Sequence, residues 1–410
     1  MKDHVAEYTP ERCSEITWIP AEQIEGAARL YAATKPACIG PGMAGASQAV
    51  NAFDLNRALA SLAAITGNLE IQGGNPNFRS PTGRRSCYGP EFSVMANLPP
   101  EQANKRIGLD VFPIITRASG IPEQLWKAIL EKKPYPVKGL GLFAGNAMCS
   151  YANSRDVEKA LAGLDFLFAV DYFQTPTTAM ADVVLPPAHW TERNDVEDLM
   201  MMNHVFCQEK LETIGMTFDE FREKGCVSIP LAYKGYEKYK GFKTPSGTGK
   251  VDLYSEAAEK DGASPLPVFR EPPQSPVSTP DLYREFPLIL TTGGRNVVYY
   301  HSAHRNIPSL RKLSPDPLLD INPETAESLN IVDGEWVRLK TMTGEVEIRA
   351  RIEDGLHPRV VHAPHGYWYG VEKGWERVNI NQVTGNESQC RATGSVQTRA
   401  LLCRVEKIAS

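Results

Sequence analysis

The stretch that decides the fold runs from Lys138 to Pro187 and reads KGLGLFAGNAMCSYANSRDVEKALAGLDFLFAVDYFQTPTTAMADVVLPP. Its apolar segments GLGLFAG and DFLFAVDYF each predict a strand, and Asn153 predicts the start of a helix between them. Strand, helix and strand within roughly 30 residues are typical of a βαβ unit, in which the strands are parallel and the crossover is right-handed. A third run, Asp182–Leu185, completes the predicted sheet. We therefore expect an α/β region with a parallel sheet.

Two loops follow the predicted strands directly. GNAMCSYANS comes after the first strand and QTPTTAMA after the second. In open α/β sheets, ligands bind at the loops that follow the carboxyl ends of the strands. These two loops are therefore candidates for ligand contact.

The residues before this unit predict helices and loops around one strand. A helix begins at Pro20, because apolar residues then recur at helical spacing. Pro36–Gly40 (PACIG) predicts a short strand, and a long helix is expected from about Gln48 to Ile65. The loop from Gly67 to Pro90 is rich in Gly and Asn, and a loop of this length inside a compact domain is usually either functional or disordered.

The last third of the chain has a different pattern. Prolines crowd residues 264–286, which predicts a semi-rigid linker. Beyond it, short alternating strands predict an all-β barrel, with one hairpin turning at Thr343 and Gly344. The expected organisation is the tail of an α/β domain, an α/β cofactor-binding domain, the linker and the barrel, over residues 1–50, 51–263, 264–286 and 287–410.

Composition excludes several classes of protein. The 410 residues are 42% hydrophobic and 23% charged, which is typical of a folded protein of two or three domains. A net charge of −5 disfavours nucleic-acid binding, and we find neither a transmembrane run nor a signal peptide. The eight cysteines form no CxxC pair, so we expect free thiols in the cytoplasm and no [4Fe–4S] cluster in this chain.

The motif Gly40–Gly45 (GPGMAG) matches GxGxxG between a predicted strand and a predicted helix. It allows a nicotinamide dinucleotide site, a turn beside some other ligand, or a plain structural turn. Pro41 in the tight turn, and the absence of a second strand ending in Asp or Glu, disfavour the dinucleotide. A nicotinamide-dependent dehydrogenase stays an outside alternative.

Two groups of basic side chains suggest an anionic ligand. Arg79, Arg84 and Arg85 follow the Gly- and Asn-rich loop, which is either a phosphate site or a solvated basic loop. In the barrel region four histidines lie near arginines and a tryptophan, where a ligand-binding rim fits better than a metal site. These residues are His301, His304, His362 and His365, with Arg295, Arg305 and Trp368.

Over nearly its whole length the chain resembles the C-terminal half of molybdopterin oxidoreductases of the dimethyl-sulfoxide-reductase superfamily, which includes formate dehydrogenase and thiosulfate or polysulfide reductases. Seven segments carry the resemblance in family order: TPERCSEITWIPAEQIEGAARLYA, RALASLAAITGNLEIQGGN, LFAGNAMCS, VDYFQTPTTAMADVVLPPAHWTER, TPSGTGKVDLYSE, TTGGRNVVYYHSAHRN, and HGYWYG followed by NINQVTG.

The resemblance implies a bis-molybdopterin guanine dinucleotide cofactor with molybdenum or tungsten, and a barrel of the double-psi type. It implies that Gln48 lies beside the metal centre. It also implies cofactor contacts from the strand-end loops (Gly145, Asn146, Asp171, Phe173 and Thr175) and from the barrel rim (Arg295, His301, His365, Trp368, Asn379 and Asn381).

Two departures from the family pattern shape our expectations. The cysteine motif for the cluster and the residue that ligates molybdenum are not in this chain, and the run MMMNHVFCQEKLETIGMTFDEFREKG lacks a helical stretch between Lys210 and Leu211. We therefore expect a truncated or split enzyme that is inactive alone and needs an N-terminal half or a separately encoded subunit. The resemblance also implies an iron–sulfur electron-transfer subunit.

A non-catalytic cofactor-binding module or remnant is the alternative to a split enzyme. The periplasm replaces the cytoplasm as the expected compartment if a preceding segment carried a twin-arginine signal. The substrate cannot be read from these residues.

Overall fold

The computed structural model describes most of the chain in two compact units. The described residues are 1–40, 42, 47–76, 98–114, 120–192, 211, 214–227, 233–238, 240–242, 244, 246–369 and 374–408. One unit combines Met1–Gly42, Asp54–Asn104 and Ala188–Val268, and the other combines Met43–Phe53, Lys105–Pro187 and Phe269–Ser410. These units divide the chain differently from the boundaries expected above, which stay a prediction.

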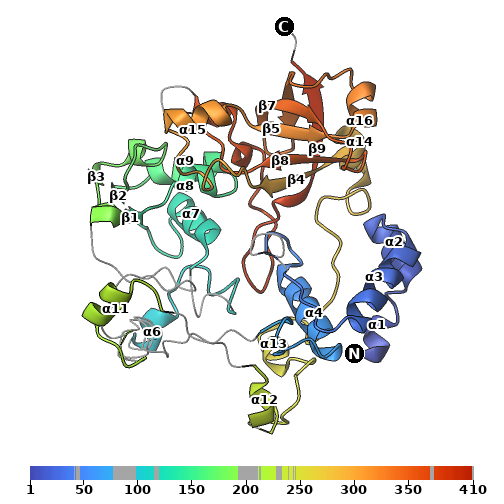
Figure 1. Ribbon diagram of the computed structural model, residues 1–410. Coiled ribbons are helices and arrows are strands. Elements are labelled where there is room, and N and C mark those ends of the chain that lie inside the picture. Colours follow the sequence, from blue (N-terminus) through green and yellow to red (C-terminus); the bar gives the residue numbers. More distant parts are fainter. Residues whose placement is uncertain are drawn as a thin grey trace. The chain divides into compact units, whose positions relative to one another are not determined.

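The second unit contains a three-stranded parallel sheet, coloured green in Figure 1, whose strand order is β1-β2-β3. Its strands are β1 (Gly139–Phe143), β2 (Phe166–Val170) and β3 (Val183–Leu185). Helix α9 (Ser154–Ala162) connects β1 to β2, and the Asn153 side chain caps it by accepting from the backbone N–H of Asp156. The predicted βαβ unit and its third strand are confirmed.

Helices cover one face of this sheet. Alternate residues of a strand point to opposite faces, so Leu167 and Ala169 lie on the face opposite Phe166 and Phe168. Helix α7 (Pro122–Glu131) and helix α9 pack against the face that carries Leu167, and Trp126 of α7 is buried there. The short helices α8 (Ala147–Ser150) and η2 (Thr178–Met180) lie in the loops after β1 and β2.

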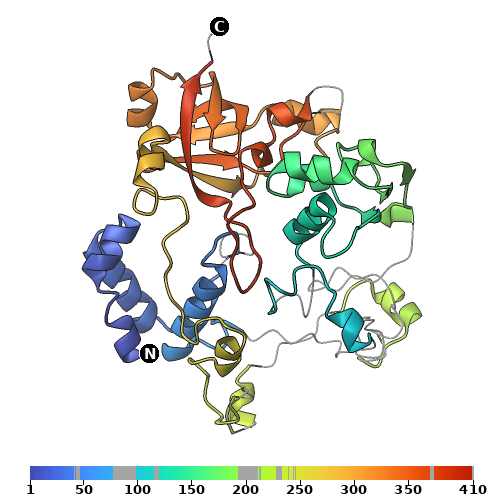
Figure 2. The ribbon, with the colours of Figure 1, turned by 180° about the vertical axis from the view of Figure 1, so that it is seen from behind.

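A closed six-stranded barrel forms the other part of this unit, coloured orange to red in Figures 1 and 2. Its order is β4-β8-β5-β7-β6-β9, with parallel pairs β4–β8 and β5–β7 and the other pairs antiparallel. The predicted hairpin joins β6 to β7, and the Thr341 N–H donates to the Gly344 carbonyl. The strands are β4 (Leu288–Gly294), β5 (Leu318–Ile321), β6 (Trp336–Lys340), β7 (Glu345–Ile352), β8 (Val360–Pro364) and β9 (Arg399–Lys407).

Alternating apolar residues fill the barrel. The interior includes Leu290, Leu319, Val337, Leu339 and Val361, each with no exposed surface. Short helices lie between the strands or before β4: α14 (Pro280–Glu285), α15 (Pro308–Leu313), α16 (Pro323–Ser328), η5 (Trp375–Arg377) and η6 (Ile380–Gln382). The predicted barrel is confirmed, whereas its double-psi type stays a prediction.

The other unit is mainly helical where it is described. The predicted helix after Pro20 is α3, and the long predicted helix begins at Ala52 as α4 rather than near Gln48. The helices are α1 (Lys2–Val5), α2 (Pro10–Thr17), α3 (Ala21–Ala33), α4 (Ala52–Ile65), α6 (Pro100–Ala103), η3 (Trp190–Glu192), α11 (Phe218–Lys224), α12 (Gly235–Lys238) and α13 (Glu256–Lys260). No helix in the described part of the chain is both long enough and apolar enough to cross a bilayer.

The strand predicted at Pro36–Gly40 is wrong. Asparagine side chains of the Gly- and Asn-rich loop form hydrogen bonds with the backbone groups of this segment that would otherwise pair with a neighbouring strand. The Ala37 N–H donates to Asn68 Oδ1 at 3.0 Å, and Ile39 exchanges two hydrogen bonds with the Asn75 side chain. The segment is therefore extended but pairs with a loop.

Candidate cofactor-binding site

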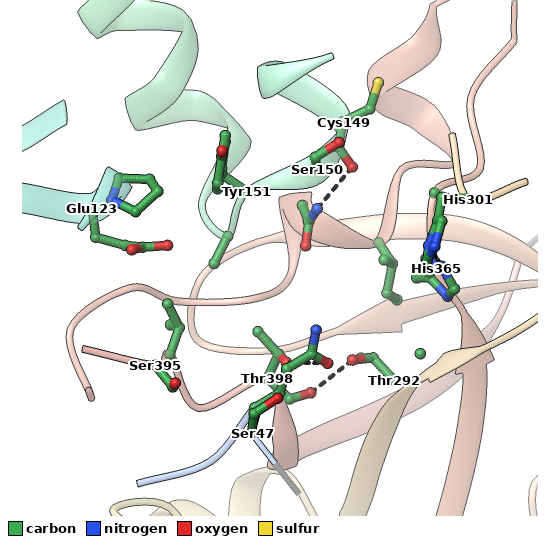
Figure 3. A pocket seen from close by; sticks show the side chains of 18 of the residues that line it. Ser47, Glu123, Cys149, Ser150, Tyr151, Thr292, His301, His365, Ser395 and Thr398 are labelled. Carbon is green, nitrogen blue, oxygen red and sulfur yellow. Dashed lines mark hydrogen bonds between the residues drawn. The ribbon is translucent and has the colours of Figure 1, made fainter. Parts of the chain in front are cut away.

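A cavity of about 550 Å³ lies in the second unit, and all of its lining residues belong to that unit. Its walls come from the segment before α4, the start of α7, the α8 turn, the end of β4, two barrel loops and the segment before β9. Figure 3 shows the side chains that surround it. Five residues predicted for the site line this one cavity: Gln48, Arg295, His301, His365 and Asn381.

Arg295 and two histidines form a chain of hydrogen bonds in the wall. His365 Nδ1 lies 3.1 Å from the Gly294 carbonyl, which only accepts, so we assign the proton of a neutral His365 to Nδ1. His365 Nε2 then accepts from His301 Nδ1 at 2.7 Å. His301 Nε2 is left to accept from the Arg295 guanidinium at 3.4 Å.

Burial favours the neutral state of both rings. It lowers the pKa of His301, which the Arg295 charge lowers further, and it also lowers the pKa of His365. Arg295 uses one donor on His301 and forms no ion pair with any described carboxylate. An arginine held in this way at a cavity wall suits an anionic group such as a phosphate.

A buried arginine fixes the backbone of the two histidines. Arg305 is 2% exposed and donates to the carbonyl oxygens of His301 and His365 at 3.1 and 3.2 Å. Its guanidinium lies 4.1 Å from the Tyr299 ring centroid and 3.8 Å from that of Tyr367. Burial lowers the pKa of Arg305 to about 10. Arg305 thus holds the histidine pair in place through its hydrogen bonds to their backbone carbonyl oxygens.

Hydrogen bonds also fix the side chains of the other two predicted cavity residues, Gln48 and Asn381. The Thr398 hydroxyl donates to Gln48 Oε1 at 3.3 Å, and the Thr398 carbonyl accepts from the Thr292 hydroxyl at 2.8 Å. On the opposite wall, Asn381 Nδ2 donates to the Cys149 carbonyl at 2.9 Å (Figure 3). Gln48 is therefore held by the segment that leads into β9.

The predicted strand-end residues gather at the carboxyl ends of β1 and β2 instead of lining the cavity. Asn146 is buried, and its Oδ1 accepts from the Thr177 hydroxyl at 2.9 Å, whereas its Nδ2 has no partner in the described structure. Thr175 is buried in the loop after β2. Asp171 accepts from the Phe173 N–H, and Gly145 precedes Asn146 directly.

Trp368 and Asn379 are buried within the protein and bonded to it. Trp368 Nε1 donates to the Ser302 carbonyl at 2.7 Å. Asn379 Nδ2 donates to the Tyr367 carbonyl, and its Oδ1 accepts from the Asn381 N–H. Both residues support the loops that carry His301 and Asn381.

The four predicted histidines do not form one cluster. His362 lies in β8, where its ring pairs with Asp320 at 3.0 Å rather than with His301 or His365. No group of three or more His, Cys, Asp or Glu is placed to hold a metal ion in the described parts of the chain. Arg79, Arg84, Arg85, most of the GPGMAG motif and residues 200–210 lie outside the described residues.

The sequence reasoning missed Glu123, Tyr151 and Thr398, which also line the cavity. Glu123 has one local signal, because Pro122 predicts the start of a helix and an acid in the first turn favours it. That signal explains a helix end and does not predict a cavity.

Two family models match the chain. A molybdopterin dinucleotide binding domain matches residues 288–400, and a molybdopterin oxidoreductase domain matches residues 25–213. Acetylene hydratase of Syntrophotalea acetylenica is 30% identical over 91% of the chain and 59% of its own length. The solved structure of acetylene hydratase from Pelobacter acetylenicus superimposes with a TM-score of 0.85 at 26% identity, over 99% of this chain and 66% of that one.

Two further relatives have names that refer to redox reactions. The F420-dependent formate dehydrogenase subunit alpha of Methanocaldococcus jannaschii is 27% identical over 89% of the chain and 58% of its own length. Dimethyl sulfoxide reductase DmsA of Haemophilus influenzae is 26% identical over 98% of the chain and 57% of its own length. The chain thus spans less than two thirds of the length of these three relatives.

Together the fold and the two matched domains define a molybdopterin-cofactor protein. The chain belongs to the molybdopterin oxidoreductases, and its relatives are members of the dimethyl sulfoxide reductase superfamily. The resemblance found in the sequence is confirmed.

Proposed function

We propose that this chain is the part of a molybdenum or tungsten oxidoreductase that binds the guanine dinucleotide forms of molybdopterin. The observation that carries the proposal is the cavity wall, where the Arg295 guanidinium faces the space without a described carboxylate partner and is oriented by neutral His301. When bound, the cofactor would supply the redox chemistry, and the protein would supply binding, orientation and charge.

A buried donor without a partner at the strand-end loops supports the fit of an acceptor-rich ligand. Asn146 Nδ2 has no hydrogen-bond partner in the described structure. Buried donors are normally satisfied, and phosphates and a guanine ring offer many acceptors. Asn146 and Arg295 would therefore contact the dinucleotide, with Asp171, Phe173 and Thr175 at the strand-end loops and His301, His365 and Asn381 at the rim.

This chain would need further groups from outside its 410 residues. Its eight cysteines have no cluster spacing, so we infer that an iron–sulfur cluster and the residue that ligates the metal come from other residues of the full enzyme or from another chain. Gln48 would then lie near the metal. We infer the cytoplasm as the compartment, an iron–sulfur subunit as the electron partner, and no turnover by these 410 residues alone.

The names of the relatives do not agree on one reaction, because they include a hydratase, a dehydrogenase and a reductase. The names therefore do not point to one substrate.

The test is cofactor content after expression in cells that make the dinucleotide. Wild-type protein should contain molybdenum or tungsten and should release GMP on acid hydrolysis. Arg295→Ala should lose most of both, whereas Arg284→Ala, at an exposed arginine of α14 outside the cavity, should keep them. A wild-type protein without metal and GMP would contradict the proposed function. Unchanged content in Arg295→Ala would reject the role of Arg295.

A further inference from the structure

Glu123 is a buried acid in the cavity wall that the proposed function does not use. It lies in the first turn of α7, is 8% exposed, and directs its carboxyl group into the space between the labelled residues of Figure 3. The neighbouring wall is tight, because a Cβ added to Gly394 would lie 2.5 Å from Ile121 Cδ1. Ile121, two residues before Glu123, therefore packs closely against the Gly394 backbone.

The carboxyl group has no partner on another described side chain. Within the described part of the chain no side chain forms an ion pair with it, and its own backbone N–H hydrogen-bonds to it. Burial raises the pKa of Glu123, which that N–H offsets only in part. A buried acid without a partner is costly, so its presence in a cavity points to N–H donors on a ligand.

The two sides of the cavity have opposite character. Figure 3 shows Glu123 on one side and the His301–His365 pair on the other. Arg295 donates to His301 on that far side, so a cation lies there while an acceptor lies at Glu123. The cavity thus suits a ligand that has N–H donors at one end and an anionic group at the other.

We propose that Glu123 accepts the hydrogen bonds of the amino group and the adjacent ring N–H of a bound pterin, and so orients the phosphate-bearing end toward Arg295. This inference rests on the proposed function and adds a ligand contact and a direction of binding to it. A carboxylate matches two parallel N–H donors in the same way that it matches an arginine.

The test compares two small probes on the full 410-residue chain purified from cells that cannot make the cofactor. Pterin carries the 2-amino group, and lumazine has an oxygen in its place. Wild-type protein should bind pterin more tightly than lumazine, as measured by fluorescence titration. Glu123→Gln should reduce that preference about tenfold, because it replaces two charge-assisted hydrogen bonds and presents an N–H to the ligand.

Two variants serve as controls. Glu70→Gln removes an equally buried carboxylate, 7% exposed, in the other unit and should leave the preference unchanged. Arg284→Ala, at the exposed arginine of α14 outside the cavity, should also leave it unchanged. Thermal unfolding of each variant checks that the fold is intact. If Glu123→Gln does not fold, Glu123→Asp takes its place and should show a preference for pterin that is weaker than that of the wild type.

The outcomes separate the two proposals. If the Glu123→Gln and Glu123→Asp variants both keep the wild-type preference, the role of Glu123 is rejected, and metal and GMP content still decide the proposed function. If the wild-type chain binds neither probe although cofactor-producing cells load it with metal and GMP, the inference alone fails. If it binds neither probe and acquires neither metal nor GMP, both fail.

Discussion

The barrel and the parallel sheet belong to the same unit but bury their surfaces very differently. The barrel closes on itself, so every strand has two neighbours and Leu339 in β6 has no exposed surface. The sheet has helices on one face, whereas Phe143, Phe166 and Leu185 on the other face are 69%, 48% and 50% exposed. Parallel sheets are normally covered on both faces.

The difference shows where this chain is self-sufficient. The barrel obtains its core from its own strands, because inward residues of all six strands pack together. The sheet obtains a core on one side only, through Leu167 and the helix residues around Trp126. Stability and binding should therefore respond to changes in the barrel far more than to changes on the open face of the sheet.

The largest effect is expected in the barrel interior. Leu339→Ala should lower the free energy of unfolding by about 2–5 kcal/mol, because it leaves a cavity among fully buried side chains. Chemical denaturation followed by circular dichroism measures this. A loss below about 1 kcal/mol would mean that the barrel does not carry the stability of the unit.

A polar contact between strands should give an intermediate effect. Asp320 in β5 is 6% exposed and bonds to Arg351 Nε at 2.6 Å and His362 Nδ1 at 3.0 Å, each directly opposite it on a neighbouring strand. Asp320→Asn should lower the free energy of unfolding by about 1–3 kcal/mol at neutral pH, because it removes the charge from both contacts.

The pH dependence has a definite sign. Burial alone would raise the pKa of Asp320, but the hydrogen bonds from His362 and Arg351 outweigh burial and lower it. This stabilisation is therefore present above the unfolded value of about 4 and is lost as the pH falls through the folded pKa. Denaturation midpoints between pH 6 and pH 3 should fall more steeply for the wild type than for Asp320→Asn. Parallel curves would contradict the assignment.

The smallest effect is expected on the open face of the sheet. Leu185→Ser changes a side chain that is 50% exposed in β3, so the free energy of unfolding should change by about 0.5 kcal/mol or less. Leu167→Ala, which alters the covered face of the same sheet, is the matched comparison and should cost several times more. Equal losses in the two variants would show that both faces are covered.

Most of the fold could be predicted because its elements have local signals. Asn153, with the apolar runs beside it, predicts the βαβ unit, and alternating residues predict the barrel strands. Pro36–Gly40 has the composition of a strand, but the partners of its N–H groups are Asn68 and Asn75, more than 30 residues later. Apolar composition cannot reveal whether such a segment finds a strand or an asparagine side chain.

The site was less predictable because its residues come together from distant segments. Resemblance brought out Gln48, Arg295, His301, His365 and Asn381, and the structure places all five at one cavity while their roles stay predictions. Glu123 was missed because an acid at the start of a helix is common. Only the folded structure shows that its carboxyl group is buried beside empty space.

The order of strands in the barrel also affects how the protein emerges during synthesis. Strand β4 pairs with β9, whose first residue follows the end of β4 by about 100 residues, and β6 needs the same strand on its other side. At about 5–20 residues per second, a ribosome needs roughly 5–20 s to make the chain between them. During that interval β4, and β6 once it has been made, each present an open edge that can pair with other chains. A nascent barrel of this kind should therefore depend on chaperones until Arg399–Lys407 has left the exit tunnel.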